Sequence, residues 1–487
     1  MLQDADALPQ LIGDYKPVDQ WQVHINQLFY RFRGDQVRNY YQTFASADYR
    51  LAHALAADYY EKVRKRDALL VKREASNENA SGSPITRRSS RLTIMEWGPG
   101  NGNLAAGFLS HLKTLDREGQ IYPRIRYVLV DWEQAVLDAA LTHPYLAAHR
   151  DLVETCPASV DHIAAAADGT VDRIICNELW NDLPAKLMSR NGSEVEEEFL
   201  RPNLSETLHA RIDDWSAFVK AFDARDVETL KRFPPFFEDL VWEREYRAVD
   251  WKGVPSRKTI TEFLRRIDDR VVVPVNVGAF ASLKEAKRLL APDAVGFSSF
   301  DAGTVDQRVL NDPDKPCSGQ FGGQQSFMVN FALAEAVVKQ LEAGVVTVES
   351  QREFVGRSLG TNVITVMDLL ATHPTARKNM EPWEQDRLIL KTIKALNETY
   401  QSSYPTKMEF PIRQDLPVEE RDTLLALVHS LKSGGVPDTV AYVTEEELMQ
   451  AGKELEEIGY DPQTFSIPLT APSGPVDYFH LSVMPRP

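Results

Sequence analysis

A glutamate followed by three glycines, spaced Glu96-x-Gly98-x-Gly100-x-Gly102, is the part of the sequence best suited to hold a ligand. Glycine adopts backbone angles that other residues rarely adopt, and it lets a ligand approach the main chain closely. The apolar residues 92–97 predict a strand before the turn, and the residues after it have the spacing of a helix. Because the first N–H groups of a helix are free, they would bind an anionic group.

The glycine spacing and the glutamate distinguish between two classes of ligand. Dinucleotides favour G-x-G-x-x-G, whereas here Asn103 occupies the position of the third glycine. A carboxylate at Glu96 would repel a pyrophosphate but would suit the ammonium and sulfonium of S-adenosylmethionine (SAM). Asp131 ends the next predicted strand, 127–130, and would accept hydrogen bonds from ribose hydroxyls, as it also would in NAD. We therefore predict SAM as the cofactor, bound by Glu96, Gly98, Gly100, Gly102 and Asp131.

Trp132 directly follows the ribose-binding aspartate and would pack on the adenine ring of the cofactor. A place in the hydrophobic core is an equal alternative for a tryptophan, which is a largely buried residue type. For the turn as a whole, the alternative is a tight strand–helix connection that holds no ligand.

A second group of polar residues follows the third predicted strand, 171–176. Because the carboxyl ends of parallel strands line the ligand crevice of such a sheet, Asn177, Glu178 and Asp182 are candidate catalytic residues. Carboxylates beside the methyl group would orient a nucleophile that donates hydrogen bonds. The alternative for both acids is a structural role, which for Glu178 is that of a helix-start acid. Asp301 follows a later strand and is expected to be a turn acid rather than a cleft residue.

The segment Met95–Leu104 resembles motif I of class I SAM-dependent methyltransferases, and Ile175–Pro184 resembles a motif of the narrower MidA-like family. That family, which includes a mitochondrial methyltransferase of complex I assembly, has a strand ending in Asn-Glu and a following Leu-Pro. Weaker matches at 300–303 and 327–333 follow in the family's order. The resemblance implies a Rossmann-like fold, SAM as cofactor and a protein substrate methylated on arginine.

The chain departs from the family pattern mainly where the acceptor would bind. Asn181 stands where the family has Asp, with Asp182 one place later, and Ala302 and Asn330 replace a Tyr and an Asp. A catalytically inactive descendant that acts as a binding or assembly factor is therefore one alternative. A small-molecule methyltransferase is another, and a nicotinamide-dependent oxidoreductase is a distant one.

The order of predicted elements indicates an α/β fold with a Rossmann-like, doubly wound sheet, because strands alternate with helices from residue 92 onward. Residues 1–90 are expected to form a helical N-terminal region with a mobile loop. Residues 91–360 are expected to form the SAM-binding domain with an inserted cap at about 190–260. Residues 361–487 are expected to form a helical extension with a possible final sheet strand at 478–483.

Composition excludes several classes of partner. The net charge of −16 disfavours nucleic acid, whose phosphates need positive charge, but is compatible with a basic protein. No apolar stretch is long enough to cross a membrane, and the three cysteines and ten histidines show no metal spacing. We expect a cytoplasmic protein without a metal, and the sequence leaves the oligomeric state open.

Overall fold

The computed structural model describes most of the chain. It describes residues 10–33, 49–76, 91–321, 323–375, 380–396, 412, 416–431, 442–461, 474 and 476–486. Residues 34–48 of the predicted helical N-terminal region, and most of the mobile loop predicted within it, lie outside these ranges.

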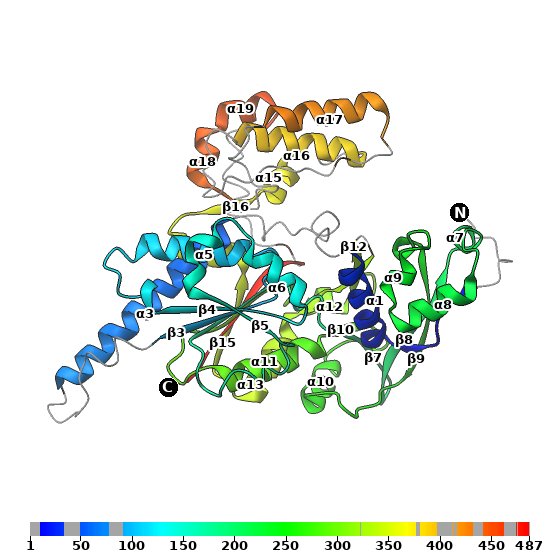
Figure 1. The fold of residues 1–487 in the computed structure, drawn as a ribbon, viewed down its shortest axis with the longest axis horizontal. Helices are drawn as coiled ribbons and strands as arrows, with labels where there is room; N and C mark the ends of the chain where they lie inside the picture. The colour runs from blue at the N-terminus through cyan, green and yellow to red at the C-terminus, as the bar shows by residue number, and fades with distance from the viewer. Residues whose placement is uncertain are drawn as a thin grey trace.

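An eight-stranded sheet forms the centre of the molecule (Figure 1). Its strands run in the order β15 (Val345–Ser350), β18 (Asp477–Met484), β11 (Gly296–Thr304), β6 (Arg173–Asn177), β3 (Leu92–Trp97), β4 (Ile125–Asp131) and β5 (Val153–Pro157), and β14 (Val329–Asn330) pairs with β11. All pairs are parallel except those of β18, which is antiparallel to both neighbours. The predicted doubly wound α/β fold is thereby confirmed, and β18 lies inside the main sheet.

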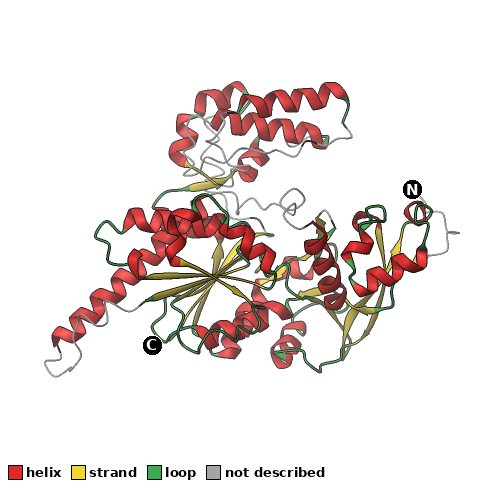
Figure 2. Ribbon diagram, in the orientation of Figure 1, coloured by secondary structure: helices red, strands yellow, loops and turns green. Residues whose placement is uncertain are grey.

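Helices cover both faces of this sheet (Figure 2). One face packs against α3 (Tyr49–Ser76), α5 (Asn103–Leu115), α6 (Gln134–Leu141) and α14 (Gln351–Leu359), and the other against α10 (Arg257–Leu264), α11 (Val277–Leu289) and α13 (Phe331–Leu341). Successive side chains of β3 point to opposite faces of the sheet. Ile94 packs with the helices on the first face, and Met95 packs with those on the second. Every residue of the strand is buried, which explains why it is mostly apolar and why Thr93 and Glu96 are its only polar residues.

A second, antiparallel sheet lies beside the first. Its strands are β7 (Lys186–Asn191), β8 (Glu194–Leu204), β9 (Leu240–Ala248), β10 (Val273–Val275) and the short β1 (Gln10–Leu11) and β2 (Lys16–Pro17). Against it pack α1 (Val18–Arg33), α8 (Trp215–Ala224) and α9 (Val227–Leu230), through an aromatic-rich core, with α7 (Glu206–His209) nearby in the chain. The two N-terminal helices therefore pack on different sheets: α1 packs on the second sheet and α3 packs on the main sheet.

A helical insertion separates β15 and α14 from β18. It contains β16 (Val363–Thr365), α15 (Val366–Thr372), α16 (Pro382–Leu396), α17 (Val418–Ser430), β17 (Tyr442–Thr444), α18 (Glu445–Gln450) and α19 (Gly452–Glu457), which share a core of their own. An ion pair between Arg50 of α3 and Glu447 of α18 joins the insertion to the main domain. No helix in the described ranges is long and apolar enough to span a membrane.

The remaining short elements connect these layers. They are η2 (Tyr122–Arg124), η3 (Leu146–Leu152), η4 (Phe237–Asp239), α12 (Gln307–Asn311), β12 (Ser318–Phe321) and β13 (Gln324–Phe327).

A buried charge links α3 to the main sheet. Arg173 of β6 is only 1 % exposed, and its guanidinium lies 3.4 Å from the carboxylate of Asp58 and donates to Ser298 Oγ at 2.8 Å. A buried charge that loses its partner is strongly destabilising, because desolvation is no longer compensated.

Replacing this partner gives a direct test of the link. We expect Asp58→Asn to lower the free energy of unfolding by about 3 kcal/mol, because Arg173 would remain buried without a counter-charge. Glu61→Gln on the same helix is the matched control, since Glu61 pairs with Lys65 in an exposed (i, i+4) ion pair. It should cost less than about 0.5 kcal/mol. Urea denaturation measures both, and equal losses would contradict the assignment.

Candidate functional site

The three glycines of the turn after β3 all adopt left-handed backbone angles, with φ of 68° at Gly98, 51° at Gly100 and 83° at Gly102. A Cβ at Gly102 would lie 3.0 Å from the carbonyl oxygen of Ala140, so only glycine fits there without a shift. A Cβ at Gly100 would meet nothing within 4 Å. The turn therefore packs tightly at Gly102 and is open above Gly100, where a ligand can approach the main chain.

Glu96 lies in the interior beneath this turn. Its side chain is 2 % exposed, and its Oε2 accepts a hydrogen bond from the phenol of Tyr127 at 2.7 Å. Burial raises the pKa of Glu96 to about 8, even though this hydrogen bond favours the ionised form. The carboxyl group is thus mostly neutral at pH 7, and a nearby cation such as the cofactor's ammonium would lower its pKa. A contact between Glu96 and SAM stays a prediction.

Asp131 and Trp132 lie at the carboxyl end of β4, next to the turn. Asp131 Oδ1 accepts a hydrogen bond from the backbone N–H of Glu133 at 2.8 Å, and burial raises the pKa of Asp131 to about 6. Trp132 is 41 % exposed and is not a core residue. The guanidinium carbon of Arg31 lies 5.6 Å from the centre of its ring. The tryptophan is therefore accessible beside the predicted ribose acid.

The loop after β6 holds Glu178 in a strained conformation. Its φ is 50°, which is uncommon for a residue with a side chain, and its N–H donates to the carbonyl of Phe300 at 2.7 Å. The phenol of Tyr478, from β18, lies 3.5 Å from Glu178 Oε2. Strain of this kind persists only where the surroundings impose it, and it clusters at functional sites.

Asp301 lies within β11 and is fully buried, so the expectation of an ordinary turn acid is wrong. Its carboxyl group accepts hydrogen bonds from the N–H groups of Asn181, at 3.1 Å, and Ala302, at 2.8 Å. Burial and then the charge of Glu178 hold the pKa of Asp301 well above its usual value. The sheet thus brings a neutral Asp301 together with Glu178 and Tyr478, each from a different strand or strand end.

Asp182 is held by two residues that the sequence analysis did not identify. Tyr30 of α1 donates its phenol proton to Asp182 Oδ2, and Gln324 of β13 donates to Oδ1. Burial raises the pKa of Asp182 to about 7, although both hydrogen bonds favour the ionised carboxylate. Tyr30 and Tyr478 are distant from the motifs in sequence, Gln324 lies just before the weaker match at 327–333, and no local pattern marks any of the three.

Three amide oxygens near these acids are buried and lack hydrogen-bond partners among the described residues: Asn177 Oδ1, Asn181 Oδ1 and Gln324 Oε1. Buried polar atoms are almost always paired in folded proteins, so such a group of unpaired acceptors indicates a place for a donor from outside the chain.

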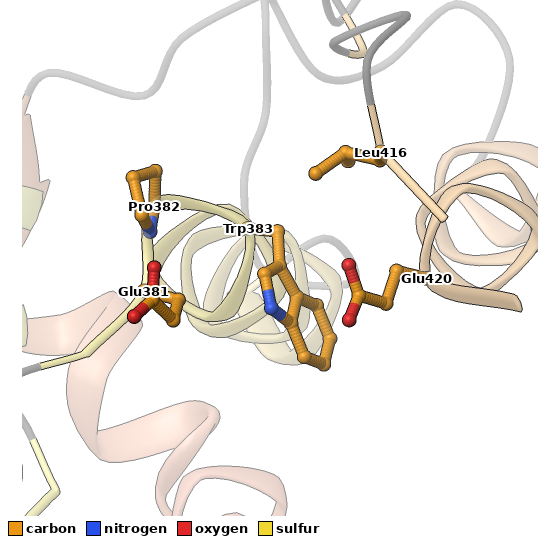
Figure 3. Close-up of a pocket in the computed structure, with 5 residues that line it drawn as sticks. All are labelled: Glu381, Pro382, Trp383, Leu416 and Glu420. Atoms are coloured by element: carbon orange, nitrogen blue, oxygen red, sulfur yellow. The ribbon is translucent and has the colours of Figure 1, made fainter. Parts of the chain in front are cut away.

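The described ranges also bear on two other kinds of site, a metal centre and a surface pocket. No group of three or more metal-ligating side chains occurs there. A pocket of about 400 Å³ lies on the helical insertion between α16 and α17, lined by Glu381, Pro382, Trp383, Leu416 and Glu420 (Figure 3). None of the predicted site residues lines it.

Part of the chain matches a known protein family. Residues 76–288 match the model of a family described as "Putative S-adenosyl-L-methionine-dependent methyltransferase". The match includes β3, the glycine turn, β4 and the loop that carries Glu178. The family match and the doubly wound fold thus indicate a SAM-dependent methyltransferase, and SAM is its cofactor. A comparison with curated proteins gave no match.

Among solved structures, the chain is similar to an uncharacterized protein of Burkholderia thailandensis, with 12 % identity, a TM-score of 0.43 and coverage of 98 % of this chain and 88 % of that one. It is also similar to a second protein of that organism, described as a "likely methyl transferase" bound to S-adenosyl-homocysteine (SAH). There the identity is 14 %, the TM-score 0.42 and the coverage 78 % of this chain and 84 % of that one.

The open space above Gly100 gives a test of the cofactor turn. Gly100→Ala should weaken SAH binding at least about tenfold in calorimetry, because the new methyl group would enter the ligand's space. Gly119→Ala is the matched control, since Gly119 also has a positive φ, of 64°, and no neighbours. Each change should cost about 1 kcal/mol of stability, but only the first should affect binding. Equal affinity in the two variants would place the ligand elsewhere.

The protonation of Glu96 gives a second test. At pH 6.5 the carboxyl group is neutral, since its pKa is about 8. If the cofactor's ammonium lies beside it, binding lowers that pKa, a proton leaves, and affinity rises as the pH increases toward 8. Calorimetry of SAH binding in phosphate and in Tris should therefore detect proton release from the wild type but not from Glu96→Gln. Equal proton release from both proteins would mean that Glu96 does not contact the cofactor.

Proposed function

We propose that the chain is a divergent MidA-like methyltransferase that methylates a protein on an arginine side chain. The observation that carries the proposal is the excess of hydrogen-bond acceptors beside the cofactor turn. Glu178 and Asp182 contribute carboxylate oxygens, and three buried amide oxygens lack donors in the described part of the chain. A guanidinium has five N–H donors and no acceptor, so it matches this set better than other common methyl acceptors do.

The chemistry asks little of the protein beyond alignment and removal of a proton. SAM, when bound, supplies a methyl group already activated by its sulfonium. Glu178 would accept hydrogen bonds from the guanidinium, fix the attacking nitrogen in line with the methyl group and take up the proton that leaves. Because burial holds Asp301 neutral, a negative charge on Glu178 would not be repelled by a second carboxylate.

Asp182 would support the same acceptor from the other side of the loop. Its pKa of about 7 means that a guanidinium nearby would shift it to the ionised form. The net charge of −16 favours the approach of a basic protein surface.

The departures from the family pattern have a partial structural explanation. Asn330, which replaces an Asp of the family, caps α13 by accepting from the N–H of Leu333 at 3.0 Å, and its amide donates to the carbonyl of Pro274 at 3.2 Å. A helix cap is a structural role that Asp and Asn fill equally well, whereas the hydrogen bond to Pro274 needs the amide of Asn. Asn181 is the departure that bears on catalysis, and it keeps an inactive binding or assembly factor as the second candidate.

Transfer of labelled methyl groups from SAM into lysate proteins tests the proposal. Label should appear in protein, and acid hydrolysis should release methylated arginine. Glu178→Gln should lower the rate by about 100-fold or more while SAH binding is kept. Glu194→Gln, an exposed acid on β8, should leave the rate unchanged.

The other outcomes identify the alternatives. Label confined to small molecules would indicate a small-molecule acceptor. SAH binding without any transfer would indicate the binding or assembly factor.

A further inference from the structure

One face of α1 carries three polar residues, Gln22, Asn26 and Tyr30, at intervals of four, so they lie above one another on the helix. We call them the α1 stripe. Gln22 is fully buried; its amide donates to the carbonyl of Asn181 at 3.3 Å and accepts from the N–H of Ala185 at 2.8 Å. Gln22 therefore holds both ends of residues 181–185. We call this segment the acceptor loop, because it belongs to the proposed binding site of the methyl acceptor.

The other two members of the stripe hold the acceptor site from further along the helix. Asn26 exchanges two hydrogen bonds, both of 2.9 Å, with the backbone of Gln325 in β13. Tyr30 donates to Asp182, and Gln324 bonds to both, lying 3.0 Å from the Tyr30 oxygen. Every member of the stripe thus contacts a segment that carries acceptor-site atoms.

The next residue along the helix turns toward the cofactor site. Arg31 lies over the ring of Trp132 at 5.6 Å, and its Nε is 3.7 Å from the carboxylate of Glu133. The N–H of Glu133 in turn donates to Asp131, the predicted ribose ligand. Adjacent residues of one helix, Tyr30 and Arg31, therefore contact the acceptor loop and the cofactor loop.

We propose that α1 couples the two ligand sites, so that cofactor binding at the 131–133 loop orders the acceptor loop through Arg31 and the stripe. The inference rests on the proposed acceptor role of the 177–182 loop. In this arrangement Tyr30 and Arg31 are positioning residues, since they act through Asp182 and through the cofactor loop. Coupling of this kind is reciprocal, so an acceptor would also strengthen cofactor binding.

The contacts of Arg31 are poorly suited to a purely structural role. Nearly half of its side chain is exposed, and ion pairs at such positions add little to stability. The Arg31→Ala variant should therefore fold normally and lose only the contact between α1 and the cofactor loop at 131–133. Tyr30→Phe interrupts it at the acceptor end, and Gln20→Ala, an exposed residue on the same helix, is the matched control.

Hydrogen exchange measured by mass spectrometry, with and without saturating SAH, tests the coupling. In the wild type and in Gln20→Ala, SAH should slow exchange in the cofactor segment 131–141, in α1 and in the acceptor segments 181–187 and 324–328. In Arg31→Ala, protection should remain at 131–141 and be lost from α1 and the acceptor segments. In Tyr30→Phe it should be lost from 181–187. SAH affinity should fall only about threefold in Arg31→Ala, as for an exposed ion pair.

Three results would overturn the proposal. Undiminished protection of 181–187 in Arg31→Ala would mean that the cofactor orders the loop by direct contact. The absence of any SAH effect on 181–187 in the wild type would mean that the sites are independent. An Arg31→Ala protein that SAH cannot saturate would make Arg31 a cofactor ligand. None of these results depends on methyl transfer, so failure of the coupling and failure of the proposed reaction are distinguishable.

Discussion

The buried guanidinium of Arg173 is the interaction on which the arrangement of the main sheet depends. A charge that is fully removed from water must be neutralised and hydrogen-bonded where it lies, and the partners of Arg173 come from two other elements. Asp58 of α3 supplies the counter-charge, and Ser298 of β11 accepts a hydrogen bond. Ser298 Oγ also lies 2.7 Å from His480 Nε2, which brings β18 into the same network. One charge in β6 thus fixes a covering helix and two neighbouring strands.

His480 carries this constraint to the candidate site. Its ring stacks on Phe300 with centres 4.3 Å apart, and Nδ1 lies 3.1 Å from Glu349 of β15. Burial lowers the pKa of His480 to about 4, so the ring is neutral near pH 7 and can accept at one nitrogen while it donates at the other. Because side chains two apart on a strand share a face, the register set by His480 also places Tyr478 beside Glu178.

The features that could be predicted from sequence are those with a local signal. Alternating strands and helices gave the fold class, and the glycine spacing gave the cofactor. The second sheet was missed because β8 and β9 pair across residues 205–239, and because acids such as Glu197 and Glu198 are rarely buried unless they are paired. Both are 2 % exposed, and Lys186 neutralises Glu197 at 2.6 Å. Tyr30 and Tyr478 were missed for the same reason: each reaches the site only through tertiary packing that no neighbouring residue encodes.

The position of β18 also determines when the newly synthesised chain can complete its main sheet. This strand fills the space between β11 and β15, yet residues 351–476 are synthesised between β15 and it. At about 5–20 residues per second, that segment takes on the order of ten seconds to emerge. Throughout this interval β11 and β15 would each present an open edge, which is a template for pairing with other chains. The helical insertion therefore determines how long the unfinished sheet needs protection in the cell.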